Sequence, residues 1–344
     1  GTIDGAANGE GNLVVSGQIK TFSGNVGSTN PLNFIVQASA VFNGTLNASS
    51  TTIEADFIAP SLVISGDITI NANITTLGIQ TYAGNVIIGS NVNLTTTNNK
   101  ITFNGTVNSE SSEANTLTID VGSSEVEFNG IVGGALNGGL GAIDITGALN
   151  LDAAITSAAS LTVSTTTNLA ANVTTAGTQT YGDGISSGAV VLSTDVTLTT
   201  TDSNITFNGT VRSDSSDTPR DLTINLDANS NGTTADLIIN GIVGGNSLPL
   251  DVISITGDLD LNSSIGNSPG ATSITVSGDA NLGADVETTG TQTYSGAVTI
   301  SNDITLTTTN ANVLFSGTTD AGTAGDALVI AAGSGDVTFT NAVG

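Results

Sequence analysis

Two pairs of acidic residues have the spacing that a hydrolytic enzyme would need. Asp258 and Asp260 lie two residues apart, as do Glu125 and Glu127, so each pair would share one face of a β-strand. Paired carboxylates can cleave glycosidic bonds by acid–base chemistry. Such an enzyme would be expected to use a basic residue or a His as well, but the sequence has no His and no Lys or Arg within ten residues of either pair. We therefore predict no catalytic residues and no enzyme activity.

Other acidic residues are candidates for binding a divalent cation. The stretch from Glu110 to Glu113 and the stretch from Asp214 to Asp221 both follow an FNGTV phrase, which indicates one recurrent acidic loop. Calcium prefers oxygen ligands, but neither stretch has the ligand spacing of a calcium-binding loop. We expect solubilising loops that bind calcium weakly at most. We predict no metal site and no cofactor.

The composition excludes several further classes of function. The 344 residues include no His, Cys, Met or Trp, which excludes disulfides, zinc sites and nucleophiles based on Cys or His. Thirty acidic residues against four Lys and Arg give a net charge of −26, which is unfavourable for binding nucleic acid. No apolar run is long enough for a membrane helix, so we predict no insertion into membranes.

A long internal repeat dominates the sequence. All three Tyr residues follow Gln-Thr in similar phrases, a degenerate copy has Phe22 at the Tyr position, and a phrase resembling ITFNGTV follows each Tyr. We predict long repeats at about 82–180, 181–293 and 294–344, the last one partial, with the degenerate copy in 11–81. All of them would belong to one continuous domain, residues 1–344. Because the chain stops inside a repeated phrase, we expect it to be a segment of a longer polypeptide.

Each repeat contains a finer pattern of short strands. Apolar and polar residues alternate over three to five positions, as in Leu117-Thr-Ile119, and Gly or Asn pairs that tolerate positive φ separate the triplets. No stretch has helical periodicity. Such strands are too short for a wide sheet, but they can coil and stack about 4.8 Å apart. The fold class that we predict is an all-β parallel β-helix, or β-solenoid, with coils of roughly 20 residues. Tandem β-sandwich domains are the alternative.

Aromatic spacing supports the coil. Phe103 and Phe128 are 25 residues apart and Phe315 and Phe339 are 24 apart, so we expect each pair to stack one turn apart and to point inward. The second repeat is longer than the first between Gly182 and Gly188 and again before Ile239, and we expect the added residues to form outward loops, including the segment 227–235.

Two other phrases invite a functional interpretation. Solenoids that carry Thr-x-Thr on the same face of every turn can bind ice, but the LTTT phrases at Leu94, Leu198 and Leu306 recur only once per long repeat. The NGIVGG phrase has no Lys and no helix after it, so it is not a phosphate-binding loop. We interpret it as a turn of the coil.

The phrases ITFNGTV, LTIDVGSSEVEFNGIVGG and IDITGALNLDAAI resemble the repeats of very large bacterial surface exoproteins. These are the filamentous-haemagglutinin-like, two-partner-secreted or autotransported proteins with β-strand repeats. The resemblance covers the chain from about Gly11 onward. It implies a right-handed parallel β-helix and a location at the cell surface or outside the cell.

The function that we expect is that of a structural segment in a secreted cell-surface exoprotein, acting as a stalk or fibril in adhesion. A structural subunit of an extracellular filament or surface layer is the alternative, and a glycan-active β-helix enzyme is an outlier. The expected partners are other copies or adjoining solenoid coils, end to end. Host or surface glycans are a further class of partner.

Overall fold

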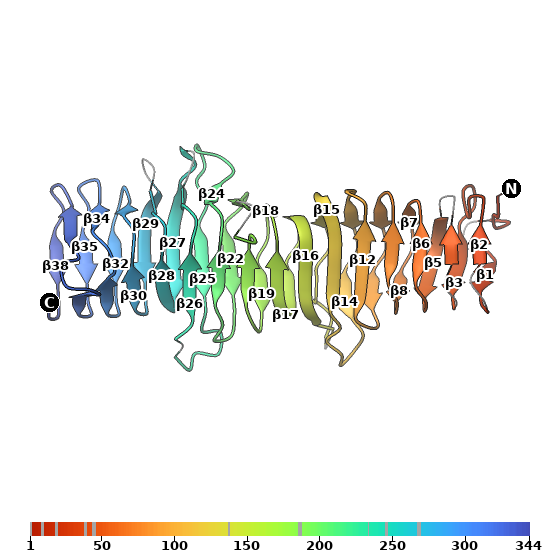
Figure 1. Ribbon diagram of the computed structural model, residues 1–344, viewed down its shortest axis with the longest axis horizontal. Helices are drawn as coiled ribbons and strands as arrows, with labels where there is room; N and C mark the ends of the chain where they lie inside the picture. The colour runs from red at the N-terminus through yellow and green to blue at the C-terminus, as the bar shows by residue number, and fades with distance from the viewer. Residues whose placement is uncertain are drawn as a thin grey trace. The chain divides into compact units, whose positions relative to one another are not determined.

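The computed structural model describes residues 2–7, 10–17, 20–37, 40–42, 46–136, 138–184, 188–232, 234–244, 247–266 and 270–344. The chain divides into two compact units, Gly1–Ser164 and Thr165–Gly344. Both consist of short parallel strands that stack as a β-solenoid, with no α-helix among the described residues (Figure 1). The two units comprise about 15 turns in all. The predicted fold class is therefore confirmed, and tandem sandwiches are wrong.

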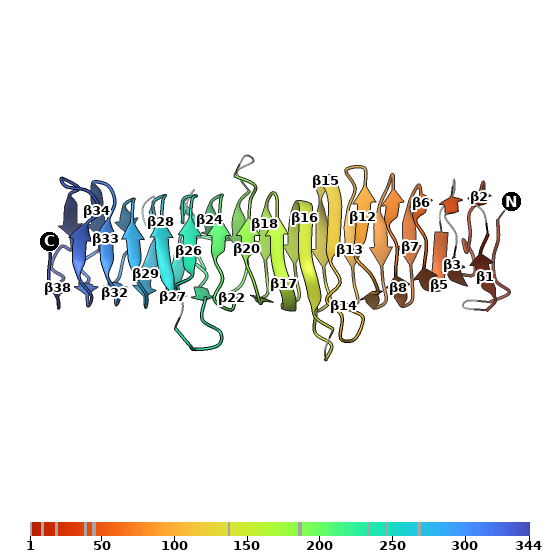
Figure 2. The ribbon, with the colours of Figure 1, turned by 60° about the horizontal axis from the view of Figure 1, so that its bottom comes forward.

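The first unit contains seventeen strands that form three parallel ladders. The chain crosses the ladders in a fixed order, so that β10, β11 and β12 belong to one turn, and β13 then pairs with β10 (Figure 2). Leu62, Gln80, Ile101 and Val126 stack in register on consecutive turns, and the turns lengthen along this series. The strands are β1 (Asn12–Val15), β2 (Lys20–Phe22), β3 (Leu32–Val36), β4 (Ala40–Phe42), β5 (Leu46–Ile53), β6 (Phe57–Ala59), β7 (Leu62–Ile64), β8 (Ile68–Ile70), β9 (Ile74–Thr76), β10 (Gln80–Tyr82), β11 (Val86–Ile88), β12 (Val92–Thr96), β13 (Ile101–Phe103), β14 (Val107–Ser109), β15 (Leu117–Phe128), β16 (Leu140–Leu151) and β17 (Ile155–Val163).

The second unit also forms three ladders. The Tyr181 ladder consists of β20, β23, β26, β28, β30, β33 and β36, and the Tyr294 ladder of β19, β22, β25, β27, β29, β32, β35 and β38. The β18 ladder contains β18, β21 and β24 and continues through single-residue bridges to β31, β34 and β37. The strands are β18 (Thr167–Leu169), β19 (Val173–Thr175), β20 (Gln179–Tyr181), β21 (Val190–Leu192), β22 (Val196–Thr199), β23 (Ile205–Phe207), β24 (Val211–Ser213), β25 (Leu222–Asn225), β26 (Asp236–Ile239), β27 (Leu250–Thr256), β28 (Asp258–Leu261), β29 (Ala271–Val276), β30 (Ala280–Leu282), β31 (Val286–Glu287), β32 (Gln292–Tyr294), β33 (Val298–Ile300), β34 (Ile304–Thr307), β35 (Val313–Phe315), β36 (Thr319–Ala321), β37 (Leu328–Ala331) and β38 (Val337–Phe339).

The long sequence repeat does not correspond to a whole number of turns. Tyr181 and Tyr294 occupy the same repeat position but lie on different ladders. From Tyr181 the chain makes four turns on its ladder, through the stacked residues Phe207, Ile239, Leu261 and Leu282. It then crosses the β18 ladder at Val286 and reaches the Tyr294 ladder two-thirds of a turn later. Equivalent residues of the two repeats therefore face different sides of the unit.

Stacked aromatic rings fill part of each core. The rings of Phe103 and Phe128 lie 5.0 Å apart, centroid to centroid, and both are fully buried. The rings of Phe315 and Phe339 lie 4.6 Å apart. The predicted stacking is confirmed for both pairs. Phe339 continues the inward column of Phe315, and it remains 37% exposed because it lies on the last turn.

The turns are tied to one another by short polar side chains. Asp67 Oδ1 accepts a hydrogen bond of 2.7 Å from the backbone N–H of Asn85, one turn later. Asn85 Oδ1 in turn accepts one of 3.1 Å from the N–H of Thr106. These bonds satisfy turn N–H groups that the strand ladders leave unpaired, which explains why Asn and Asp are frequent between the strands.

Gly105, in the phrase ITFNGTV, is required for a different reason from the one expected. Its φ is not positive, but a Cβ added there would lie 2.3 Å from the carbonyl oxygen of Gly84 in the preceding turn. The close approach of stacked turns, and not a left-handed backbone, excludes a side chain at this position.

The predicted outward loop of the second repeat is present. Asn229, Ser230, Asn231 and Gly232 are exposed and form no strand, although Ala235 at the end of the segment is buried. The shorter insertion between Gly182 and Gly188 is described only in part, since residues 185–187 lie outside the described residues.

We predict that Phe103→Ala lowers the free energy of unfolding by about 3–5 kcal/mol, because it removes a buried ring from the middle of a stack. Phe339→Ala is the matched control and should cost clearly less, since its ring is already partly exposed. Urea unfolding followed by far-UV circular dichroism measures both. Equal losses would contradict the role assigned to the stack.

Candidate functional site

The first acidic pair is neutralised by a basic residue from the neighbouring turn. Lys100 Nζ lies 2.8 Å from Glu125 Oε1 and 3.0 Å from Glu127 Oε2. The pair does share one strand face, as predicted, but the expectation that no basic residue accompanies it is wrong. Lys100 precedes β13, which stacks directly on the part of β15 that carries Glu127. A full turn of the coil separates them in the sequence, so a search of neighbouring positions misses the contact.

These contacts stabilise the charged forms of Lys100 and Glu127. The hydrogen bond to Glu125 raises the pKa of Lys100 above its ordinary 10.5, and the hydrogen bond from Lys100 lowers the pKa of Glu127 below its ordinary 4.5. Thr102 Oγ1 also donates a hydrogen bond of 3.3 Å to Glu127. A glycosidase acid needs a raised pKa, so the arrangement favours an ion pair over acid catalysis.

The second acidic pair lies in a row of carboxylates. Asp258 and Asp260 share an outward face of β28, and Asp236 stacks on Asp258 from the preceding turn. Burial, followed by the charges of Asp258 and Asp260, raises the pKa of Asp236. Burial likewise raises the pKa of Asp258, with a contribution from the charge of Asp279.

Two members of this row, Asp258 and Asp260, already accept hydrogen bonds. Asp258 Oδ1 accepts a 2.8 Å hydrogen bond from the N–H of Asp279, and Asp260 accepts hydrogen bonds from the side-chain amides of Asn262 and Asn281. Within the described ranges, no group of three or more acidic residues has the geometry to hold a metal ion. Asp258 and Asp260 thus join neighbouring residues and turns through hydrogen bonds, while their charges disfavour the charged form of Asp236.

The two acidic loops have the same closure. Each follows a strand that ends in Ser, β14 at Ser109 and β24 at Ser213. Ser109 Oγ accepts the N–H of Asn115 at 3.0 Å, and Ser213 Oγ accepts the N–H of Arg220 at 2.9 Å. The prediction that one recurrent loop follows both FNGTV phrases is therefore supported by a shared hydrogen bond.

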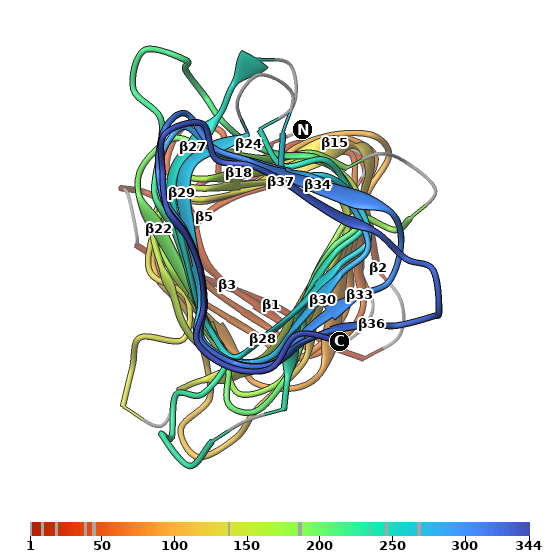
Figure 3. The same cartoon turned by 90° about the vertical axis from the view of Figure 1, so that its left-hand side faces the viewer.

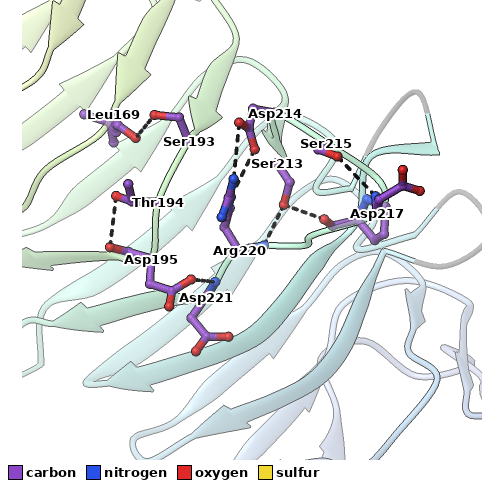
Figure 4. Close-up of polar contacts among 11 residues, drawn as sticks. Leu169, Ser193, Thr194, Asp195, Ser213, Asp214, Ser215, Asp217, Arg220 and Asp221 are labelled. Carbon is purple, nitrogen blue, oxygen red and sulfur yellow. Dashed lines mark hydrogen bonds and ion pairs between the residues drawn. The ribbon is translucent and has the colours of Figure 1, made fainter.

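In the second loop, acidic residues form contacts within the loop and with the preceding turn (Figure 4). Arg220 Nε donates a 3.0 Å hydrogen bond to Asp214, and this contact lowers the pKa of Asp214. Asp195, from the preceding turn, accepts the N–H of Asp221 at 3.1 Å. Since Arg220 and the loop backbone occupy these oxygens, the loop does not present a preformed set of cation ligands.

A groove of about 630 Å³ lies on the first unit over β3, β5, β8 and β11. Its polar lining consists largely of residues that tie the turns together. Asn33 Nδ2 donates to Asn12 Oδ1 at 3.2 Å, and Asp67 and Asn85 accept the turn hydrogen bonds described above. Asp67 is the single titratable residue among the described residues of the lining, so they offer no acid–base pair.

The LTTT and NGIVGG phrases have structural roles. The second Thr of each LTTT phrase is buried, and its Oγ1 donates to the carbonyl three residues later, as at Thr96, Thr200 and Thr308. In NGIVGG, Val132 is buried and forms bridges to the turns before and after, while Gly133 has a φ of +70°. The phrase interpreted as a turn therefore also contains one inward strand position.

The sequence interpretation missed a buried polar cluster around Gln80. Its Nε2 lies 3.3 Å from Thr76 Oγ1 and 3.0 Å from the carbonyl of Thr95, and its Oε1 accepts a 2.7 Å hydrogen bond from Tyr82 Oη. Gln80 and Tyr82 are fully buried, and burial raises the pKa of Tyr82. The cluster leaves no side-chain group of Gln80 unpaired, as a buried amide requires.

The same cluster occurs once in every long repeat. Gln179 binds Thr175, the carbonyl of Thr199 and Tyr181, and Gln292 makes the corresponding bonds with Thr288, Thr307 and Tyr294. The signal was present in the sequence, because the alternation in each Gln-Thr-Tyr triplet places Gln on the same inward side as Tyr.

No protein-family profile, curated protein or solved structure matches this chain. The described part of the chain contains no helix that is long and apolar enough to span a membrane. The geometry therefore has to carry the functional argument by itself.

We predict that Gln80→Leu destabilises the fold by about 1–3 kcal/mol for each polar group left without a partner. Tyr82 Oη and the carbonyl of Thr95 both lose their bonds to Gln80. Adding Tyr82→Phe to Gln80→Leu should recover part of the loss, because it removes one unpaired hydroxyl. A double-mutant cycle measured by urea unfolding checks this, and strictly additive losses would contradict it.

We predict that Lys100→Gln lowers the free energy of unfolding by about 0.2–1 kcal/mol near neutral pH, and less at high salt. Since the pKa of Glu127 is lowered, its contribution is present above 4.5 and is lost as pH falls through its lowered value. Since the pKa of Lys100 is raised, its contribution is present below 10.5 and is lost at higher pH. Lys20→Gln, at an exposed position, is the control, and an equal effect of both variants would contradict the role of the ion pair.

Proposed function

We propose that this chain is a structural segment of a secreted bacterial cell-surface exoprotein and acts there as a stalk or fibril in adhesion. The observation that carries the proposal is the in-register stacking of successive turns along three ladders in each unit. A stack of this kind gains about 4.8 Å of length per turn. Its contacts are made between near neighbours, so it can be extended without redesign of a central core.

The chemistry of the surface supports a mechanical role. The carboxylate pairs are engaged in ion pairs and hydrogen bonds with neighbouring residues and turns. The net charge of −26 makes neighbouring rods repel each other, which opposes side-by-side clumping. Adhesion through such a rod would rely on many weak contacts along its length.

An antibody raised against the chain tests this proposal on cells of the source organism. We expect it to label intact cells from outside and to detect a polypeptide much larger than 33.9 kDa. Permeabilised cells serve as the control for internal antigen. Labelling of isolated filaments, with a polypeptide near the size of the chain, would favour the filament subunit instead. Labelling that requires permeabilisation would overturn both.

A further inference from the structure

One face of the second unit carries a regular column of hydroxyl groups. The register of the Tyr294 ladder stacks Thr197 on Thr223, then Ser254, Thr275 and Thr293 in consecutive turns. These residues alternate with buried residues such as Leu198 and Ile274, so their side chains point outward. Figure 3 shows β22, β27 and β29 of this ladder along one side of the view.

A second column runs beside the first. Thr174 stacks on Thr199, which stacks on Asn225 and then on Thr256. Thr199, Asn225 and Thr256 each lie two residues after a member of the first column. Neighbouring hydroxyls are therefore separated by about 4.8 Å between turns and by about 6.6 Å along a strand.

The two columns are uncharged, although the chain carries a net charge of −26. The first column continues through Leu314 to Thr338, and no charged residue occurs in either. By contrast, the outward column of the Tyr181 ladder includes Asp260 and Asp320. Among the described residues, no side chain is hydrogen-bonded to the hydroxyls of Thr197, Thr223, Ser254, Thr275 or Thr293. The first column is thus neutral, evenly spaced and without side-chain hydrogen bonds, although Asp195 and Asp221 lie two residues before Thr197 and Thr223. Such a column fits a partner that is itself neutral and periodic.

We infer that this face binds ordered water and, through it, the surface of ice. Each Thr presents a methyl group, which restricts adjacent water, and a hydroxyl that can join a water lattice. Because the strands hold the hydroxyls at fixed spacing, the entropic cost of ordering them has already been met by folding. Liquid water offers no matching order, so the face would discriminate the solid from the liquid.

The two columns contain no aromatic residue, which favours ice over a crystalline polysaccharide, because sugar rings commonly stack on exposed aromatic side chains. The rings of this ladder belong to the inward positions: Tyr294 and Phe315 are fully buried, and Phe339 is 37% exposed at the last turn. The inference goes beyond a stalk function, since a stalk needs no neutral face.

The sequence concealed this face because the hydroxyls come from unlike phrases. Thr197 and Thr199 lie in VTLT, whereas Thr223 lies in LTIN and Thr293 in QTY. A Thr-x-Thr on the same face of every turn, as expected for ice binding, is therefore replaced here by columns that mix Thr with Ser and Asn.

The test uses the complete chain and two matched double variants. Thr223→Lys with Thr275→Lys places two charges on the proposed face. Thr206→Lys with Thr299→Lys makes the same change on outward positions of the Tyr181 ladder. Circular dichroism and urea unfolding confirm that each variant is folded. Should the first double variant not fold, Thr275→Lys alone replaces it, since Thr275 is exposed.

The readouts are thermal hysteresis, inhibition of ice recrystallisation and incorporation into a growing ice hemisphere. We expect all three for the unmodified chain and the Thr206/Thr299 variant, and their loss in the Thr223/Thr275 variant. An unmodified chain that shows no hysteresis and is excluded from ice would overturn the inference. So would equal activity of both variants, or cosedimentation with crystalline cellulose or chitin in the absence of any effect on ice.

Discussion

Backbone hydrogen bonding between successive turns, held in register, is the constraint on which the other features of both units depend. Strand β10 pairs with β7 before it and β13 after it, and the same residue positions face each other at every step. Because the register is maintained, a side chain that suits its position in one turn meets a similar side chain in the next. The aromatic stacks, the Asn and Asp turn bonds and the close glycine contacts are all consequences of this alignment.

A purely apolar interior would leave that register weakly defined, since Val, Leu and Ile can slide past one another with little change in packing. The Gln80 cluster and its two counterparts oppose such slippage. Each Gln amide binds a Thr and a Tyr hydroxyl of its own turn and a carbonyl of the next turn, so a change in the register between turns would break the bond to that carbonyl. One cluster occurs in every long repeat, so each repeat contains one buried polar contact that defines the register between its turns. Specification by buried polar groups costs some stability and favours a single alignment.

The long sequence repeat does not correspond to a whole number of turns, so equivalent residues of successive repeats in the second unit lie on different sides of the coil. In the second unit, Tyr181 and Tyr294 occupy the same place in the repeat but different ladders, so the loops and polar residues that accompany them also change side. The equivalent Tyr residues of the two repeats in this unit therefore lie on different sides of the coil. Columns of outward residues can nevertheless differ in chemistry, as the uncharged column through Thr223, Ser254 and Thr275 and the column through Asp260 show. A chain of this design can thus combine a mechanical role with a specialised face.

Local features of the sequence determined a large part of this structure. The alternation in triplets such as Leu117-Thr-Ile119 established the strands and their inward side, because a strand places successive side chains on opposite faces. The spacing of Phe103 and Phe128 established the coil and one of its stacks.

Tertiary structure decided which residues of adjacent turns lie opposite each other, because the loops between the strands differ in length from turn to turn. Hydrogen-bonded partners in adjacent turns are 17 positions apart at Ala48 and Ser65 but 32 apart at Asn208 and Asn240. Only that variable spacing brings Lys100 to Glu127, and it likewise aligns Thr223 with Thr275 by way of Ser254. The physical reason is that strand alternation is a property of adjacent residues, whereas contacts between turns depend on the length of every intervening loop.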